Sequence, residues 1–312
     1  MRSAFVTTLI ERAKQDKDIY LLTGDLGFSV FERFKKEFPT RFIDCGVAEQ
    51  NMIGVAAGLA LSGKKVIVYS IIPFINMRCF EQIRNDICLH NLDIKIVGVG
   101  AGFSYGAQGP THHALEDLAI MRPLPNIQIL CPVDSTEAKL ATQEMLKVKG
   151  PFYLRLEKEG EENIYSKEFR FKIGKANMIK SGKDITIIGL GSILNNAILA
   201  AQKIEEKYHI SIRIISMTTL KPLDNNIILK AARETKAIFT IEEHSMVGGL
   251  GSAVADILAE AKSDAYFKKI AVPDRFVEQA GSQNYLRDKN GLSVQTIQNI
   301  IGNVWKSIIN IR

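Results

Sequence analysis

The chain has 312 residues, of which 46% are apolar and 24% are charged, and its formal net charge is +6. This composition is typical of a globular protein with a sizeable core, and the length allows two domains. No apolar stretch reaches the roughly 18 to 20 residues that a membrane-spanning helix needs. The Lys and Arg residues form no block and do not alternate with aromatic residues, so the sequence favours neither a membrane nor nucleic acid as partner. Its positive charge would instead attract anionic metabolites.

Cysteine usage and the N-terminal segment both favour a cytoplasmic protein. The four cysteines show no CxxC spacing, which predicts neither a zinc site nor a disulfide framework and suits a reducing compartment; they are Cys45, Cys79, Cys88 and Cys131. Residues 1–20 carry charges throughout, as an amphipathic helix would, and lack the continuous apolar segment of a signal peptide.

In the first half of the chain, apolar β-branched runs alternate with helical patterns. The predicted strands are 19–25, 41–46, 64–72, 93–102, 127–132 and 151–158. The predicted helices are 30–38, 49–62, 78–90, 113–124 and 134–148, the last with Asp134 or Ser135 as its N-cap. Pro73 follows strand 64–72, where we expect a turn. Continuous Val, Ile and Leu runs that alternate with helices predict a mostly parallel α/β sheet.

A charged segment without a core pattern, 157–170, predicts a linker to a second domain. Beyond it, strands are predicted at 184–192, 210–217, 236–243 and 267–274, and helices at 195–208, 225–235, 249–261 and 293–308. We therefore expect an α/β protein of two domains: one at 1–160, a linker at 161–174, and a smaller domain at 175–312.

Glu49 is an isolated carboxylate ahead of a helix of small apolar residues, in the stretch DCGVAEQNMIGVAAGLALSG. The helix dipole favours an acid in the first turn, so Glu49 can be interpreted as a helix-start residue. The same acid has few polar neighbours, and a buried carboxylate must be paired or share a proton. On this second interpretation, Glu49 holds a heterocyclic nitrogen in its protonated form. Position alone does not decide between the two.

The Gly-rich loop GAGFSYGAQGPTHHALED carries His112 and His113 before a helix expected from about Ala114. Adjacent histidines do not share a helix face, so they are a poor metal pair. Imidazoles at a helix N-terminus could donate to hydroxyl groups or shuttle protons. The alternative is a capping loop with two structural histidines. Two further segments, IIGLGSILNNA and GGLGSAVAD, resemble dinucleotide loops only weakly, and tight strand-to-helix turns explain them better.

Together, these segments resemble the transketolase family of thiamine-diphosphate-dependent transferases. The similarity is to its C-terminal half, a pyrimidine-binding domain followed by the C-terminal domain, and it covers nearly the whole chain. Its most specific pieces are RFIDCGVAEQNMIGVAAGLAL, FEQIRNDI, GPTHHALEDLAIMRPLPN, PFYLR and EEHSMVGGLGSA. The resemblance implies an enzyme of carbohydrate metabolism that transfers a two-carbon ketol unit from a ketose or ketose phosphate to an aldose.

The resemblance also implies roles for single residues. Glu49 would hydrogen-bond N1′ of the cofactor's aminopyrimidine and promote the imino tautomer that deprotonates thiazolium C2, in a place where little water competes. His112 would contact the C1 hydroxyl of the substrate, with His113 beside it in the substrate site. Arg155 would bind a substrate phosphate with its guanidinium fork. Asp25, in TGDLG, would lie near the cofactor across a subunit interface.

Three positions depart from the family's pattern. The aromatic residue that packs on the aminopyrimidine corresponds to Ile75 without gaps; we predict that Phe74 supplies the ring through a local shift around Pro73, with an aliphatic contact from Ile75 as the alternative. The acid that reads ketose stereochemistry is Gln108 here, and a substrate-contacting histidine is Gly100. These two departures leave the substrate open, and it need not be an ordinary pentose phosphate.

The family's diphosphate and Mg²⁺ site is a GDG motif followed by an Asn on an N-terminal domain, and TGDLG is not that motif. The resemblance therefore implies a partner chain of similar size that holds the diphosphate and the Mg²⁺, with no metal ligands on this chain. The active site would lie between chains in an α2β2 assembly with β–β contact.

Other functions of the same fold remain open. The β chain of a 2-oxo acid dehydrogenase, or a relative of deoxyxylulose-phosphate synthase, would share the role of Glu49 but transfer carbon after decarboxylation. The His pair and Arg155 favour phosphorylated sugars instead. A non-catalytic binding subunit would also keep the fold, but the presence of Glu49 argues against it.

Overall fold

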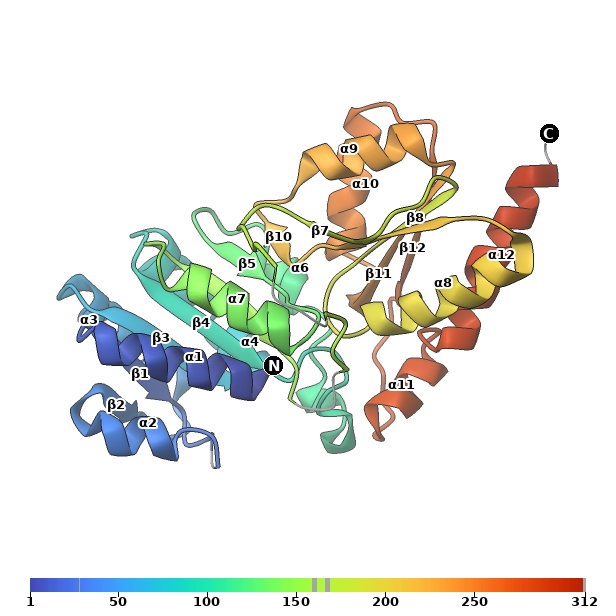
Figure 1. Cartoon of the computed structure of the whole chain (residues 1–312). Coiled ribbons are helices and arrows are strands. Elements are labelled where there is room, and N and C mark those ends of the chain that lie inside the picture. Colours follow the sequence, from blue (N-terminus) through green and yellow to red (C-terminus); the bar gives the residue numbers. More distant parts are fainter. Residues whose placement is uncertain (28, 159–161, 166–168, 311–312) are drawn as a thin grey trace.

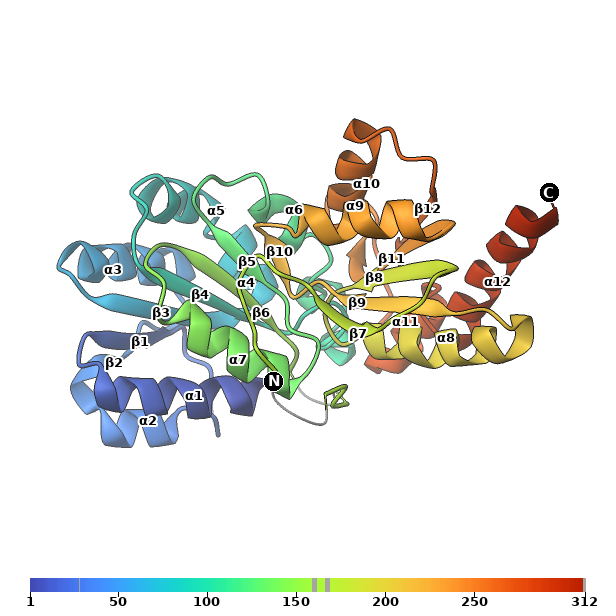
Figure 2. The ribbon, with the colours of Figure 1, turned by 45° about the horizontal axis from the view of Figure 1, so that its top comes forward.

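The computed structural model describes the whole chain except residues 28, 159–161, 166–168, 311 and 312. Figures 1 and 2 show that the described residues form two sheets, the first built mainly from the N-terminal half and the second from the C-terminal half. Helices cover both faces of each sheet. The predicted fold class, two α/β domains with mostly parallel sheets, is confirmed.

The first sheet has the strand order β10-β5-β6-β4-β3-β1-β2. Its strands are β1 Ile19–Thr23, β2 Phe42–Asp44, β3 Lys65–Ile71, β4 Ile94–Val99, β5 Gln128–Leu130, β6 Phe152–Leu156 and β10 Thr219–Lys221. Neighbouring strands are parallel except β10, which pairs antiparallel with β5. The central strands β4 and β6 are buried on both faces, as nearly continuous apolar runs require.

The helices of the first half are α1 Arg2–Gln15, α2 Glu32–Glu37, α3 Glu49–Leu61, α4 Ile72–Met77, α5 Phe80–Gln82, α6 Asp117–Met121 and α7 Ser135–Met145. Helices α1 and α7 pack against each other on one face of the sheet, and α3 and α4 lie on the other (Figure 2). Asp134 is the N-cap of α7, because its side chain accepts a hydrogen bond of 2.8 Å from the N–H of Glu137.

Two predicted helices have different bounds in the structure. The helix predicted at 78–90 is preceded by α4, and Pro73 lies in the first turn of α4, where its missing N–H is not needed. After α5, the chain continues as a π-helix at Ile83–Cys88. The helix predicted from about Ala114 begins only at Asp117, because Ala114 forms an antiparallel bridge with Gly102 instead.

The second sheet has the strand order β12-β11-β8-β9-β7, with β7 antiparallel to β9. Its strands are β7 Asn177–Lys180, β8 Ile185–Gly189, β9 Ile212–Ser216, β11 Ala237–Ser245 and β12 Tyr266–Val272. The helices are α8 Leu194–Tyr208, α9 Asn225–Glu234, α10 Leu250–Glu260, α11 Gln283–Lys289 and α12 Val294–Asn310. Helices α8 and α12 pack together on one face, and α9 and α10 on the other (Figure 2). The sequence patterns predict neither β7, β10 nor α11.

Glu137, at the start of α7, joins the two halves. Its buried carboxylate accepts hydrogen bonds from the N–H of Val133 at 3.0 Å and from the hydroxyls of Tyr165 at 2.8 Å, Ser216 at 2.8 Å and Thr218 at 2.6 Å. Tyr165 lies in the predicted linker, so this part of the linker is tied to α7. The exact limits of the linker remain a prediction.

A second buried network joins β6 to the C-terminal half. Glu243 Oε1 accepts hydrogen bonds from the N–H of Phe103 at 2.6 Å and from Gln283 Nε2 at 3.0 Å, and Arg287 donates to its other oxygen. Gln283 Nε2 also donates to Glu157 Oε2 at 3.1 Å. The end of β11 is thus fixed to both the Gly-rich loop and α11.

The GGLGSA segment is a strand-to-helix turn, as predicted. The buried carboxylate of Glu242 accepts hydrogen bonds of 2.7 Å from the N–H groups of Leu250 and Gly251 in the first turn of α10. A Cβ atom at Gly249 would lie 2.0 Å from Glu242 Oε2, so the carboxylate can approach the helix only because a glycine is there.

Candidate active site

Glu49 is both the first residue of α3 and a buried acid. Its side chain is only 3% exposed, and its Oε2 atom accepts a hydrogen bond of 3.1 Å from Arg78 Nη1. The other oxygen, Oε1, is buried and has no hydrogen-bond partner among the described residues. The two interpretations of Glu49 from the sequence are therefore compatible: helix-start position and burial occur together.

Helix α4 separates a core side from a site side beside Glu49. Ile75 is fully buried in the core, whereas Phe74 is half-buried, and the guanidinium of Arg78 lies 4.2 Å from the centroid of the Phe74 ring. Phe74 and Arg78 share one helical face because they are four residues apart. The carbonyl oxygen of Arg78 accepts a hydrogen bond of 2.8 Å from Gln50 Nε2, which ties the end of α4 to the start of α3.

An open hollow of about 430 Å³ lies in front of Glu49. It is lined by the residues before α3 and in its first turn, together with Arg78; these are Val47, Ala48, Glu49, Gln50, Asn51 and Arg78. The hollow therefore has a buried carboxylate at its base and a movable cation at its edge.

His112 belongs to the same group of side chains. Its ring lies 5.1 Å from the Phe74 ring in an edge-on arrangement, and its Nδ1 atom is 3.0 Å from Thr111 Oγ1. Burial lowers the pKa of His112, and the positive charge of Arg78 lowers it further. His112 lies in a 3-10 turn, Pro110–His112, and not at the N-terminus of an α-helix as predicted from the sequence.

His113 does not join that group. It is only 5% exposed and packs edge-on against Phe103, with 5.2 Å between the ring centroids. Burial is the main cause that lowers the pKa of His113. The two adjacent histidines thus have different surroundings, and His112 is the one that contacts Phe74.

The two positions that depart from the family's substrate contacts lie in the same loop. Gly100 has a φ of +95°, and a Cβ atom there would lie 2.2 Å from Cδ2 of Tyr105, so the tyrosine ring covers the glycine. The Tyr105 ring lies 6.2 Å from the His112 ring. Gln108 is exposed at the end of a 3-10 turn. Tyr105 therefore occupies space that a side chain at position 100 would need.

Asp25 lies close to Glu49 along the backbone of another strand. It is exposed, has a φ of +52°, and its N–H donates a hydrogen bond of 2.9 Å to Asp44 Oδ1. The preceding residue, Gly24, is in contact with Glu49, since a Cβ atom there would lie 3.7 Å from Glu49 Cγ. Asp25 is thus at the rim of the Glu49 region.

The structure places Arg155 in the core, away from the role that the resemblance implies. Arg155 is 3% exposed, and its Nε and Nη2 atoms donate to the two carboxylate oxygens of Asp117 at 2.8 and 3.2 Å. Nη2 also donates to the carbonyl oxygens of Ala114 at 2.8 Å and Glu243 at 3.2 Å. A bidentate buried pair of this kind holds α6 and β11 against β6. We therefore correct the expected phosphate-binding role of Arg155 to a structural one.

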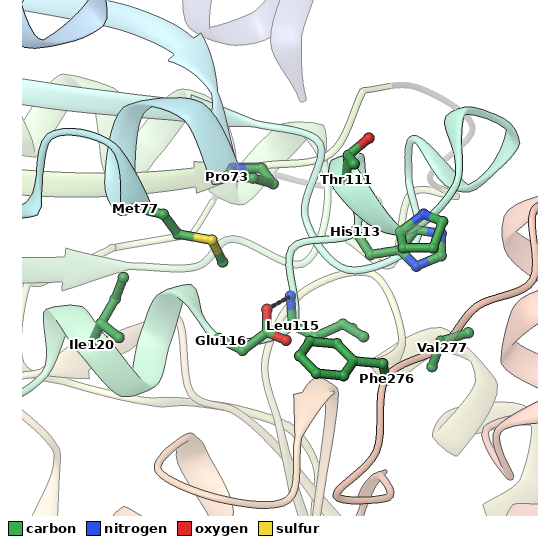
Figure 3. A pocket seen from close by; sticks show the side chains of 10 residues that line it. Pro73, Met77, Thr111, His113, Leu115, Glu116, Ile120, Phe276 and Val277 are labelled. Atoms are coloured by element: carbon green, nitrogen blue, oxygen red, sulfur yellow. Dashed lines mark hydrogen bonds between the residues drawn. The ribbon is translucent and has the colours of Figure 1, made fainter.

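A second hollow, of about 420 Å³, lies on the other side of α4 and is shown in Figure 3. Pro73 and Met77 line it from α4, and Phe276 and Val277 line it from the loop after β12. His113 borders it, but neither Glu49 nor His112 does. Because this hollow is mostly apolar and excludes the candidate catalytic side chains, we place the site at Glu49 instead.

Two residues of this region were not predicted from the sequence, namely Arg78 and Tyr105. The spacing of four residues between Phe74 and Arg78 was a usable signal for the first, whereas the contact between Tyr105 and Gly100 depends on the loop conformation. Among the described residues, no group of three or more His, Cys, Asp or Glu side chains could hold a metal ion. None of the described helices is long and apolar enough to cross a membrane.

Comparison with known families gives two adjacent matches. Residues 1–160 match the pyrimidine-binding domain of transketolase, and residues 174–297 match the transketolase C-terminal domain. One of the two subunits of an apulose-4-phosphate transketolase from Phocaeicola vulgatus is 39% identical over 297 residues, covering 93% of this chain and 94% of that protein. The 6-deoxy-6-sulfo-D-fructose transketolase subunit SqwH of a Clostridium species is 37% identical over 298 residues, covering 95% and 92%.

Solved structures agree with these matches. A split-gene transketolase, described as an inactive beta4 tetramer, has a TM-score of 0.88 at 37% identity and covers 98% of this chain and 97% of its own. The transketolase of Campylobacter jejuni has a TM-score of 0.79 at 18% identity, which shows the shared fold, and this chain spans 46% of its length. On the family matches and the full-length relatives together, the chain belongs to the transketolase family.

Proposed function

We propose that the chain is the pyrimidine-side subunit of a thiamine-diphosphate-dependent transketolase, which transfers a two-carbon ketol unit from a ketose or ketose phosphate to an aldose. The observation that carries this proposal is the carboxylate of Glu49, which borders a hollow and keeps one buried oxygen without a partner among the described residues. A buried polar atom without a partner costs free energy. A ligand that donates a hydrogen bond at this point, as a protonated ring nitrogen does, would remove that cost.

When bound, thiamine diphosphate would supply a nucleophilic thiazolium carbon. Glu49 would hold N1′ of its aminopyrimidine in the protonated form, because little water reaches a side chain that is 3% exposed. Phe74 would offer a ring face to the pyrimidine, since Ile75 is fully buried in the core. Asp25, at the rim, would face the cofactor from the neighbouring strand.

His112 would act on the substrate. Its lowered pKa favours a neutral imidazole, in which one ring nitrogen donates and the other accepts a hydrogen bond. Such a ring can bind a substrate hydroxyl and exchange a proton with it. Gln108, exposed in the same loop, would contribute a neutral polar contact where the family has an acid.

A partner chain would complete the site. We propose that this partner binds the diphosphate and Mg²⁺ in an α2β2 assembly, because the family's GDG motif has no counterpart in this sequence. Two relatives support the arrangement: one is named as a single subunit of a transketolase, and a structure at 37% identity is described as an inactive beta4 tetramer.

Reconstitution tests the proposed function. The chain alone should show no ketol transfer, and adding a diphosphate-domain subunit of the split transketolase type should restore it. Ketol transfer by the chain alone would contradict the split arrangement. Assays with ketose donors and with 2-oxo acids should be run in parallel, because release of carbon dioxide would identify a 2-oxo acid enzyme or a deoxyxylulose-phosphate-synthase relative instead.

A further inference from the structure

We propose that Arg78 occupies the place of the aminopyrimidine in the chain without cofactor, and that it must turn away when the cofactor binds. The inference rests on the proposed function, because it uses the pyrimidine-binding roles of Glu49 and Phe74. It adds a residue that neither the sequence motifs nor the relatives point to, and it gives that residue a task in loading the site.

Arg78 contacts the two groups that the pyrimidine would need. Its Nη1 atom donates a hydrogen bond of 3.1 Å to Glu49 Oε2, and its guanidinium carbon lies 4.2 Å from the centroid of the Phe74 ring. A protonated aminopyrimidine would make the same pair of contacts, a hydrogen bond to the acid and a flat contact with the ring. One side chain therefore covers both.

The chemistry of arginine suits this task. A guanidinium is planar, always charged, carries N–H donors along its edge and stacks on aromatic faces. In these respects it resembles a protonated heterocycle more closely than a lysine ammonium does. It also lowers the cost of holding Glu49 ionised, because a buried carboxylate without a partner is strongly destabilising.

Arg78 is able to leave, since its side chain is 49% exposed while the Glu49 side chain is 3% exposed. The backbone of Arg78 is held by Gln50 at 2.8 Å, so only the side chain needs to rotate into solvent. Arg155 offers a contrast, because that guanidinium is 3% exposed and makes several buried hydrogen bonds. Rotation of Arg78 would uncover the carboxylate and the Phe74 ring in one movement.

Two effects of opposite direction follow from this arrangement. Arg78 stabilises the chain without cofactor, because it pairs with Glu49. It also weakens cofactor binding, because its contacts must be broken first and the binding free energy is reduced by that amount. A residue that simply held the cofactor would change affinity in the other direction.

The test measures cofactor affinity in the complex reconstituted with the diphosphate-domain partner. Arg78→Met keeps the apolar stem but removes the donors, and we expect it to lower the Kd for thiamine diphosphate by about three- to tenfold, the range for a half-exposed ion pair. Arg78→Lys keeps the charge but not the plane, so its Kd should fall between the two. Arg84→Met, an exposed arginine in the following helical segment, is the matched control and should leave the Kd unchanged.

A second measurement uses thermal unfolding without cofactor. Arg78→Met should lower the melting temperature of the cofactor-free chain relative to wild type, and Arg84→Met should not. An unchanged or raised Kd in a folded Arg78→Met complex would overturn the inference. If the wild-type complex binds no thiamine diphosphate at all, the proposed function itself fails, and this result is distinct from an effect of Arg78.

Discussion

Glu49 and Glu137 occupy the same kind of position, the first turn of a helix that follows a strand, and both are buried. Glu137 accepts four hydrogen bonds of 3.0 Å or less from both halves of the chain. Glu49 accepts one, from a half-exposed arginine, and keeps an oxygen without a partner among the described residues. Burial alone therefore does not distinguish a structural acid from a functional one. The number of filled acceptor positions does.

The largest expected effect concerns Glu49. Glu49→Gln in the reconstituted complex should lower kcat by at least about 10³-fold, because an amide cannot stabilise a protonated ring nitrogen as a carboxylate does. The melting temperature should change little. The matched control is Glu81→Gln, which changes an exposed acid on α5 and should leave kcat unaltered. Turnover near the wild-type level in Glu49→Gln would make Glu49 a helix-start residue only.

Glu137 should show the opposite pattern, a loss of stability. Glu137→Leu leaves several buried donors without an acceptor, and each such donor costs about 1–3 kcal/mol, so we expect the free energy of unfolding to fall by at least about 3 kcal/mol. Urea denaturation measures this. Glu144→Gln, at a partly exposed position of the same helix, should stay within about 0.5 kcal/mol of wild type. Equal effects of the two substitutions would show that the buried network does not join the halves.

Lys95 extends the comparison to a buried cation whose donors are used. Its Nζ donates to the carbonyl oxygens of Val148 and Gly150 at 2.7 Å and lies 2.7 Å from Asp93 Oδ1, yet burial lowers the pKa of Lys95 to about 8. The unfolded chain then binds more protons than the folded chain between about pH 8 and 10.5, so the free energy of unfolding rises with pH in that window.

Lys95→Met tests this pH dependence. Relative to the variant, the wild type should gain up to about 3 kcal/mol as the pH rises from 8 to 10.5. Chemical denaturation of both proteins at several pH values measures the difference. A difference that stays constant with pH would mean that Lys95 titrates alike in the folded and unfolded chains.

The smallest expected effect is on His112. Arg78→Met removes a nearby positive charge, so the pKa of His112 should rise toward its ordinary value but remain lowered by burial. NMR titration of the labelled imidazole in the cofactor-free chain measures the change. No change would mean that Arg78 spends most of its time away from Glu49 and Phe74, which would weaken the inference about its role.

Much of the fold could be predicted from the sequence, because its strands are long apolar runs and most of its helices have clear starts. The errors fall where contacts between distant segments decide the structure. The helix expected near Ala114 begins late because Ala114 pairs with Gly102, and β10 forms only because β5 presents a free edge to it. Neither pairing has a local sequence signal.

The candidate site shows the same limit. The motif around Glu49 could be read from the sequence, and the acid is buried as that reading requires. The role of Arg155 could not, because nothing in PFYLR reveals that Asp117 lies opposite it and uses its guanidinium. Phe74 and Ile75 are neighbours in the sequence, and only the course of α4 decides that Ile75 enters the core. The choice of Phe74 as the stacking ring remains a prediction.

Strand β10 has a practical consequence for dissecting this protein. It comes from the C-terminal half but completes the sheet of the N-terminal half, where the N–H of Cys131 also donates a hydrogen bond of 2.7 Å to the carbonyl oxygen of Thr218. A fragment that stops near residue 174 would therefore leave the edge of β5 unpaired, and an unpaired edge invites aggregation. Chimeras between relatives should exchange residues 218–221 together with the sheet that receives them.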